Sequence, residues 1–311
     1  MGELVPLGVE VEPARWWDET QKGDILHYMN RPPIQNVRLA KQKGYKVVMT
    51  ETCDQTASRS RGKLFAQRWV TKLTRAVVPH GLTVRLAWDV YQELDAMVYL
   101  VPHEWETVQY LFGADPQRGH VIPHGLEVEV IAELGRPQPE EDYLISTATI
   151  HPRKNTVLLA RAARLAKIPI LFLGRPYAPD DPYFLEFKSC VDDHIVRYPG
   201  FVSVPEKYRY LRGARGFVLL SQYESGSVAV YEAAAAGLPL LLSNLPWATR
   251  AYREARDAKY VSARSAESLA GALATFYDQA HRKPGTTFPI LSGRQVAAKY
   301  LEIYQTVLGR A

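Results

Sequence analysis

The sequence has little cysteine and no long apolar run. Its 311 residues include two cysteines, Cys53 and Cys190, which lie far apart and lack the spacing of metal ligands. This usage argues against a disulfide framework and predicts a reducing compartment. No apolar run approaches the roughly 20 residues that cross a bilayer, and the first residues show no signal-peptide pattern. We therefore expect a cytoplasmic protein without a transmembrane helix.

A strong charge of one sign is also absent. The chain carries 38 Lys and Arg residues against 33 Asp and Glu residues, a formal net charge of +5. This balance suits an anionic substrate or a membrane surface as well as a nucleic acid. Because no nucleic-acid-binding motif accompanies it, we predict no nucleic-acid partner. The length suffices for two domains, and 47% hydrophobic residues are typical of a folded globular chain.

Predicted strands and helices alternate along the chain, but the G-x-G-x-x-G dinucleotide fingerprint is missing. Short apolar runs predict buried strands, and a period of 3.6 residues predicts helices. The predicted strands are 4–11, 24–28, 45–50, 96–101, 143–147, 168–173, 195–200, 216–220, 238–242 and 260–261. The predicted helices are 34–43, 58–77, 82–94, 102–112, 155–167, 183–192, 204–211, 228–236, 265–280 and 294–308. Prolines and acids over 129–142 predict a linker. The pattern favours α/β domains with parallel sheets.

A Gly/Ser turn between the predicted strand 216–220 and the predicted helix 228–236 is the strongest candidate for a site. Free backbone N–H groups and the helix dipole favour an anion such as a phosphate at a helix start. Gly226 allows that anion to approach the backbone closely. We predict that the amides of Gly226, Ser227 and Val228 contact the phosphate.

Two glutamates flank this turn. Glu224 precedes it, and Glu232 follows eight positions later, one helical turn past Val228. A carboxylate is a good acceptor for paired sugar hydroxyls, so Glu232 is placed to bind a polyol beside the phosphate. The alternative is a helix whose glutamates are simply solvated.

The stretch ESGSVAVYEAAAAGLP resembles the E-G-F-G-x-x-x-x-E-A-x-A-x-G-x-P signature of retaining GT-B glycosyltransferases of the family-4 type, the glycosyl transferases group 1. The resemblance covers 24–308 and is strongest over 120–250. It implies two Rossmann-like α/β domains that face a cleft, with the first domain shortened. The implied acceptor-side domain is 1–130 with the last helix, 293–311, packing back on it. The implied donor domain is 131–292.

The resemblance also implies donor-binding residues. The loop 149–155 resembles the family's G-R-x-x-x-x-K-G/N loop, whose basic side chains hold the donor diphosphate. Lys154 matches the lysine, Thr149 takes the arginine's usual place, and Arg153 substitutes for its charge. Cations held close in a partly dry cleft stabilise a leaving diphosphate. Without the resemblance, Arg153 and Lys154 read as a surface charge pair.

Further roles come from the same resemblance. Glu232 is implied to bind ribose hydroxyls, and Glu224 to bind or position the transferred sugar. Gly174 resembles the glycine beside the nucleotide. Tyr198 lies in the strand and loop whose backbone reads the base.

The acceptor side departs from the family. After the predicted strand 45–50, where the family often carries a histidine near the reacting sugar, this chain has Glu51 and Asp54. Either acid points into the cleft, which makes Glu51 a candidate catalytic residue, or both are ordinary loop acids. His27 is expected to be a buried, hydrogen-bonded histidine. The Gly-Gly loop of the family's first domain is missing.

The most basic stretch is 58–77. On a helix it carries a basic stripe beside an apolar one, formed by Arg61, Arg68, Lys72 and Arg75, and by Phe65, Trp69, Leu73 and Val77. This arrangement suits an interfacial helix on an anionic membrane surface, which would make the protein peripheral at the inner face of a membrane. The alternative is a core-facing helix with a solvated basic edge.

The resemblance thus implies a retaining glycosyltransferase. It would move a sugar from a nucleoside-diphosphate sugar, such as a UDP-sugar, to a hydroxyl of a glycan or lipid-linked glycan, without metal or cofactor. The missing Gly-Gly loop, Thr149 and the missing histidine motivate an alternative, a non-catalytic subunit that binds a nucleotide or glycan. A nucleotide-sugar epimerase or glycan phosphorylase of the same fold is a third reading.

Overall fold

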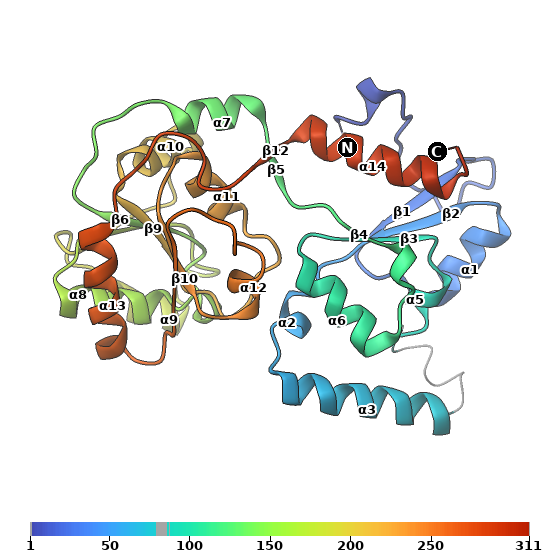
Figure 1. Cartoon of the computed structure of the whole chain (residues 1–311), viewed down its shortest axis with the longest axis horizontal. Coiled ribbons are helices and arrows are strands. Elements are labelled where there is room, and N and C mark those ends of the chain that lie inside the picture. The colour runs from blue at the N-terminus through green and yellow to red at the C-terminus, as the bar shows by residue number, and fades with distance from the viewer. Residues whose placement is uncertain (1, 79–85, 87, 311) are drawn as a thin grey trace. The chain divides into compact units, whose positions relative to one another are not determined.

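The computed structural model describes residues 2–78, 86 and 88–310, and the chain forms two compact units (Figure 1). Unit 1 comprises Met1–His124 and Leu291–Ala311, and unit 2 comprises Gly125–Ile290. The division therefore lies a few residues before the boundaries that the sequence suggested, 130/131 and 292/293.

Unit 1 is built on a parallel sheet of four strands in the order β1-β2-β3-β4. Its strands are β1 (Ile25–Met29), β2 (Lys46–Thr50), β3 (Ala96–Tyr99), β4 (Gly119–Val121) and the short β12 (Leu291–Ser292). Its helices are η1 (Val5–Leu7), α1 (Ile34–Gln42), α2 (Asp54–Ala57), α3 (Arg61–Val77), α5 (Val90–Glu93), α6 (Pro102–Phe112), η3 (Pro116–Arg118) and α14 (Gly293–Val307).

Both faces of the unit 1 sheet are covered. Successive side chains of a strand point to opposite faces. Val47 and Met49 of β2 accordingly pack in a cluster with residues of α1, α5 and α6. Val48, between them, packs on the other face with Ile303 of α14. The C-terminal helix therefore belongs to the core of unit 1, where Figure 1 shows α14 beside β1 and β2.

Unit 2 is built on a parallel sheet of six strands in the order β11-β10-β9-β6-β7-β8. Its strands are β5 (Gly125–Leu126), β6 (Leu144–Thr147), β7 (Ile170–Leu173), β8 (Val196–Gly200), β9 (Gly216–Leu219), β10 (Leu240–Ser243) and β11 (Ala258–Val261). Its helices are α7 (Val128–Gly135), η4 (Pro152–Lys154), α8 (Thr156–Ala166), α9 (Pro182–Lys188), α10 (Val204–Gly213), α11 (Val228–Ala235), α12 (Pro246–Thr249) and α13 (Ala266–Gln279).

Alternation of side chains also divides the core of unit 2 into two layers. Leu240 and Leu242 of β10 pack in a cluster with residues of α7, α10 and α11. Leu241, between them, packs on the opposite face with residues of α8, α9 and α13. Strands buried on both faces read as continuous apolar runs, as parallel sheets require. Each unit thus has the Rossmann-like α/β architecture expected from the sequence.

One predicted strand and part of a predicted linker differ from the structure, and one predicted helix lies largely outside the described residues. The predicted strand 4–11 is wrong, because Val5 starts the 3-10 helix η1, which contains Pro6, and Gly8, with φ of 83°, ends it. The linker predicted over 129–142 is partly wrong, because it contains most of α7, whose Leu134 is buried in the core. Much of the predicted helix 82–94 lies outside the described residues, and its described end is α5.

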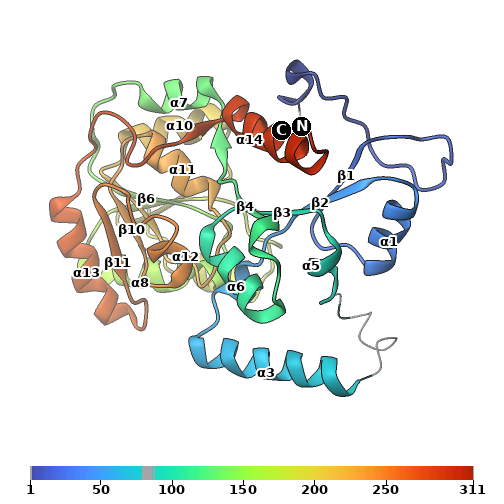
Figure 2. The ribbon, with the colours of Figure 1, turned by 45° about the vertical axis from the view of Figure 1, so that its right-hand side comes forward.

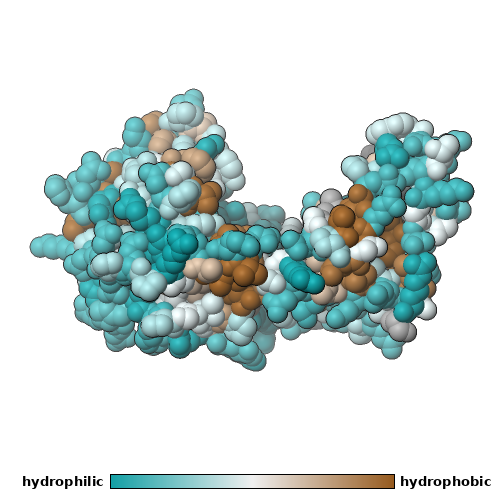
Figure 3. All heavy atoms as spheres, turned by 90° about the horizontal axis from the view of Figure 1, so that it is seen from above, coloured by the Kyte–Doolittle hydropathy of each residue, from teal (hydrophilic) through white to brown (hydrophobic). Residues whose placement is uncertain are grey.

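The surface of the protein is mixed. The face drawn in Figure 3 is mostly hydrophilic, with separate hydrophobic patches among the polar residues. Such a mixture is usual for folded chains. Over the described part of the chain, none of the helices combines the length and apolar character needed to cross a membrane.

Candidate active site

The order of strands in unit 2 places a topological switch point at the carboxyl ends of β6 and β9, and parallel sheets generally have a crevice at such a point. From β6 the chain continues to β7 on one side, and it later returns to β9 on the other side of β6. The loops that follow β6 and β9 therefore leave in opposite directions. Ligands of parallel sheets bind at such a switch point. These loops contain Arg153, Lys154 and Glu224.

The loop after β6 is fixed by its own hydrogen bonds and by the neighbouring loop. The Arg153 amide donates to His151 Nδ1 at 3.2 Å. Asn155 has the left-handed φ of 53°, and its side-chain amide donates to the Leu220 carbonyl at 2.7 Å. Asn155 is the N-cap residue of α8, but its side chain makes no capping hydrogen bond, because it joins the two loops instead. The Gln222 amide also donates to the Arg153 carbonyl at 2.8 Å.

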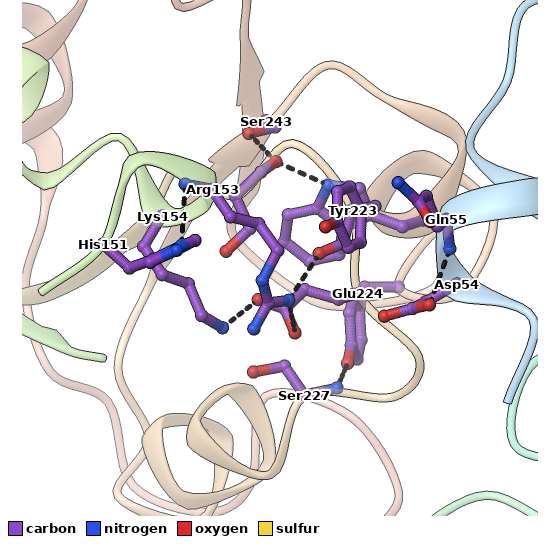
Figure 4. A network of polar contacts seen from close by, with 12 residues as sticks. Asp54, Gln55, His151, Arg153, Lys154, Tyr223, Glu224, Ser227 and Ser243 are labelled. Atoms are coloured by element: carbon purple, nitrogen blue, oxygen red, sulfur yellow. Dashed lines mark hydrogen bonds and ion pairs between the residues drawn. The ribbon is translucent and has the colours of Figure 1, made fainter. Parts of the chain in front are cut away.

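Two cations of this loop converge on one acid. Figure 4 shows Lys154 and Arg153 pointing toward Glu224, which precedes α11. Lys154 Nζ donates to one oxygen of the Glu224 carboxylate, and Arg153 Nη1 lies 3.4 Å from the other. Arg153 also donates to the Tyr223 carbonyl at 3.0 Å. The Glu224 side chain is 9% exposed and that of Lys154 is 11% exposed, so this charge cluster is largely removed from solvent. The structure therefore brings together three residues that the sequence singled out.

The start of α11 differs in one respect from the predicted anion site. Gly226 has φ of 59°, in the left-handed region that glycine favours, and it turns the chain into the helix. The Ser227 amide donates to the Tyr252 hydroxyl at 3.0 Å. Because Tyr252 is buried, the pKa of its hydroxyl is raised well above the usual value. The prediction that the Ser227 amide contacts a phosphate is therefore not supported here, whereas the amides of Gly226 and Val228 stay predicted contacts.

Glu232, the second acid, is also held by a lysine. It lies in α11 and is buried, and its carboxylate accepts from Lys207 Nζ at 2.5 Å. Lys207 comes from α10, which begins with a capping box of Ser203 and Glu206. Sequence reasoning missed Lys207, because a single lysine in a polar helix looks like any solvated lysine. Lys207 differs from such a lysine by its ion pair with Glu232, which lies 25 residues further along the sequence.

The predicted nucleotide contacts lie at the ends of β7 and β8. A Cβ atom on Gly174 would come within 1.9 Å of the Ala148 carbonyl oxygen, so only glycine fits there. The Tyr198 hydroxyl donates to the Gly174 carbonyl at 2.9 Å, and the Tyr198 ring packs against Phe187. Tyr198 thus has a packing role that the sequence did not indicate. Thr149 lies in the loop that Gly174 approaches.

Two buried hydroxyls near the crevice also indicate a binding site, and the sequence did not predict them. Thr147 Oγ1, at the end of β6, and Ser225 Oγ, in the turn before α11, make no hydrogen bond to any described residue. Buried polar atoms without a partner are uncommon and mark places where a ligand or water binds. No group of three or more His, Cys, Asp and Glu residues suited to a metal ion occurs within 2–78, 86 and 88–310.

Glu51 lies in unit 1 and has different surroundings. It is 5% exposed. One carboxylate oxygen accepts from Arg31 Nε at 2.8 Å and lies 2.6 Å from Arg31 Nη2, and the other accepts from the Tyr91 hydroxyl at 2.8 Å. The Arg31 guanidinium lies 4.8 Å from the centre of the Tyr91 ring. Both oxygens of Glu51 therefore have partners within unit 1, and its catalytic role stays a prediction.

The crevice with its paired acids and cations coincides with the match to a known family. Residues 130–284 match the model of the family described as glycosyl transferases group 1. Unit 2 is therefore similar to the glycosyl transferases group 1. It covers most of unit 2 and includes Arg153, Lys154, Glu224 and Glu232. A search of curated proteins gave no match.

Solved structures show the fold. The chain is 14% identical to a glycosyltransferase from Rickettsia africae, with a TM-score of 0.66 over 93% of this chain and 78% of that one. It is 15% identical to a UDP-forming trehalose-phosphate synthase from Burkholderia xenovorans, with a TM-score of 0.61 over 98% and 72%. HepE of Anabaena, solved with UDP and glucose, is 11% identical, with a TM-score of 0.55 over 89% and 74%. Some further matches are longer proteins, of which this chain spans as little as 54%. The fold is that of GT-B glycosyltransferases.

Proposed function

We propose that this chain belongs to the glycosyl transferases group 1 and is a retaining glycosyltransferase of the family-4 type that uses a nucleoside-diphosphate sugar. The observation that carries the proposal is the convergence of Lys154 and Arg153 on Glu224 at the switch point of unit 2. Cations, a carboxylate and a helix start then lie within one crevice. This combination suits a ligand that has a diphosphate and a sugar.

The cations would serve the leaving group. When the bond between the anomeric carbon and the diphosphate oxygen breaks, negative charge grows on the diphosphate. Lys154 and Arg153 are largely or partly buried, and cations in such surroundings stabilise developing charge more than cations in water do. The new bond forms from the acceptor oxygen to the same face of the anomeric carbon, and the acceptor proton passes to the departing phosphate oxygen. The configuration is thereby retained, and no metal ion is needed.

The two acids would bind carbohydrate on either side of the diphosphate. Glu224 would accept hydrogen bonds from the transferred sugar, and Glu232 from the ribose hydroxyls. Lys207 offsets the charge of Glu232. Gly174, Thr149 and Tyr198 would surround the nucleotide, with the amides of Gly226 and Val228 on the phosphates. The UDP bound in the HepE structure and the UDP-forming activity of the trehalose-phosphate synthase make UDP the first nucleotide to test.

The proposed acceptor is a hydroxyl of a glycan or of a lipid-linked glycan. A lipid-linked acceptor would bring the protein to the inner face of a membrane as a peripheral protein. The segment 58–77, which the sequence marks for contact with an anionic membrane surface, contains α3.

A second candidate is a non-catalytic subunit that binds a nucleotide or glycan. Thr149, in place of the family's arginine, and the Ser227 amide, which is engaged by Tyr252, favour it. Transfer and donor-hydrolysis assays with a broad acceptor panel separate the two candidates. Nucleotide binding without turnover would favour the subunit.

Calorimetry of the Glu232→Ala variant tests the ribose contact. A screen of nucleoside diphosphates for thermal stabilisation first selects the ligand, beginning with UDP, because a ligand specific to the native state raises its stability. Loss of hydrogen bonds to a charged acceptor lowers affinity by at least about tenfold. The matched control is Glu254→Ala, whose side chain is 85% exposed in the same unit. Unchanged affinity of the Glu232→Ala protein would count against the ribose role.

A further inference from the structure

Helix α3 turns its polar side toward the protein and its apolar side toward solvent. The side that faces unit 1 carries Thr71, which is 1% exposed, the partly buried Gln67 and Thr74, and one apolar residue, Leu64, that packs against the core. The opposite side carries five large apolar residues that are all more than half exposed: Phe65, Trp69, Val70, Leu73 and Val77. We call these five residues the outer face of α3. A helix that packs on a core normally has the reverse arrangement.

Contacts of the inner side hold α3 in this orientation. Arg75 donates to the carbonyls of Phe112 at 3.1 Å and of Trp88 at 2.8 Å. The Arg68 guanidinium lies 4.4 Å from the centre of the Tyr110 ring. These contacts, all within unit 1, explain why arginines occupy the inner side of the helix. Figures 1 and 2 both show α3 along the outside of unit 1, with α6 on one side of it.

The charges around the outer face have one sign. On a helical projection Arg61 and Lys72 border the outer face along one edge, and Lys63 borders it along the other. Lys72 Nζ lies 5.9 Å from the centre of the Trp69 ring, which itself contacts Phe65. The whole of 55–77 contains no Asp or Glu. A partner that covers this face must therefore be apolar at its centre and negative at its rim.

An anionic lipid bilayer has these properties. A helix with Trp, Phe and Leu on one side and Lys and Arg at its borders lies flat in the interface, with its apolar side among the acyl chains and its cations at the headgroups. Each Lys or Arg near an anionic leaflet adds to the attraction. A second copy of this chain fits less well, because a twofold contact between outer faces would set the basic borders of the two copies against each other.

We propose that the outer face of α3 is a docking surface for an anionic membrane. In the docked state Trp69 and Leu73 lie among the acyl chains, and Lys63 and Lys72 lie at the phosphates of the headgroups. The contact itself does not depend on sugar transfer. Only its use, to bring the protein to a lipid-linked acceptor, rests on the proposed function.

Sedimentation with vesicles tests this docking surface. The full chain is mixed with vesicles of phosphatidylcholine alone or of phosphatidylcholine with phosphatidylglycerol. We expect preferential partition onto the anionic vesicles and a roughly tenfold or greater loss of it in Trp69→Ser/Leu73→Ser. Lys63→Glu/Lys72→Glu is expected to lose a similar factor on anionic vesicles only. The matched control is Trp17→Ser/Leu165→Ser, which removes the same residue types from positions that are 80% and 57% exposed elsewhere.

Three results would overturn the proposal. The first is a wild-type protein that binds neither kind of vesicle. The second is equal binding by the α3 variant and its matched control, with both folded by circular dichroism. The third is a dimer in sedimentation velocity that Trp69→Ser/Leu73→Ser dissolves in the absence of vesicle binding, which would assign the outer face to a second copy. Because the vesicles contain no donor or acceptor, failure here leaves the proposed sugar transfer untouched.

Discussion

Glu51 in unit 1 and Glu224 in unit 2 are both buried acids that follow a strand of a parallel sheet, but their partners differ. Glu51 is held by an arginine, with two N–H groups near one oxygen, and by a tyrosine hydroxyl. Glu224 is held mainly by Lys154, with the Arg153 guanidinium at the longer distance of 3.4 Å.

We infer from this difference that Glu51 is a structural acid and that Glu224 is a ligand-binding one. A planar guanidinium near a carboxylate and beside an aromatic ring makes a specific, rigid pair. The lysine ammonium is a compact charge on a flexible stem, which can turn from a carboxylate to a phosphate at little cost. Buried hydroxyls without a hydrogen-bond partner do not distinguish the two acids, because among the described residues they occur in both units, as at Thr147 and Ser225 in unit 2 and at Tyr28 and Tyr99 in unit 1. We infer from the ion pairs that the polar groups around Glu51 stabilise unit 1, whereas those around Glu224 bind a ligand.

The largest expected effect is on stability, in Glu51→Ala. Removal of one partner from a buried ion pair leaves an uncompensated charge and costs about 3–5 kcal/mol. Because the Arg31 side chain is 26% exposed, we expect the lower end of that range. Hydrogen exchange of the β2 amides measures the loss, since these amides lie in the sheet of the same unit.

The control for this variant is Glu93→Ala, which breaks the exposed pair of Arg38 and Glu93. Exposed pairs contribute little to stability, so this variant should be nearly as stable as the wild type. A catalytic Glu51 would give a different result: Glu51→Gln would fold normally and lose transfer. That outcome would show that Glu51 takes part in transfer and is not a structural acid.

The next largest effect is on activity, in Lys154→Met. Removal of one group that stabilises developing negative charge lowers the turnover rate by about 10²–10³. Unit 2 is expected to lose some stability, because the buried Glu224 then keeps Arg153 at the longer distance of 3.4 Å, so the assays are run where the variant is folded by circular dichroism. Initial-rate transfer assays with the nucleotide sugar selected by the stability screen measure the change.

The matched control is Lys283→Met, which breaks the partly exposed pair of Lys283 and Asp257 in the same unit. It should transfer at the wild-type rate. If the Lys154→Met protein also does so, Lys154 has no part in leaving-group stabilisation, and the ion pair with Glu224 is structural like that of Glu51.

Much of the fold of unit 2 could be predicted from the sequence, because its strands are short apolar runs and its helices begin and end with recognisable residues. The runs that became β9 and β10 are examples. The residues of the motif around Glu224 and Glu232 were found because they lie close together in the sequence. Lys207, Tyr252 and Thr147 were missed, because each acquires its significance from a neighbour that only the fold brings near.

The important features of unit 1 are harder to predict, because they depend on residues that lie far apart in the sequence. The stretch 58–77 reads as an amphipathic helix, but periodicity alone does not tell which side faces the protein. The inner side is fixed by long-range contacts such as those of Arg75 with the Trp88 and Phe112 carbonyls. Likewise, the burial of Glu51 depends on Arg31 and Tyr91, which lie 20 and 40 residues away.

The smallest expected effect concerns the interior of unit 1 and depends on pH. His27 is hydrogen bonded to Tyr304 at 2.6 Å and to Thr50 at 2.8 Å, and burial lowers its pKa from 6.5 to about 4. The folded state therefore disfavours the charged imidazole, so the stability from neutral His27 is complete above the unfolded pKa and falls as the pH drops from 6.5 toward 4. At pH 5 the loss reaches up to about 2 kcal/mol. Urea denaturation at pH 7.5 and pH 5 measures it, with His194→Gln as the control at an exposed histidine. The His27→Gln protein should have a lower free energy of unfolding than the wild type at pH 7.5. Between pH 7.5 and pH 5, however, its free energy of unfolding should fall by less than that of the wild type. An equal fall in both proteins would show that other groups of the chain cause the pH dependence.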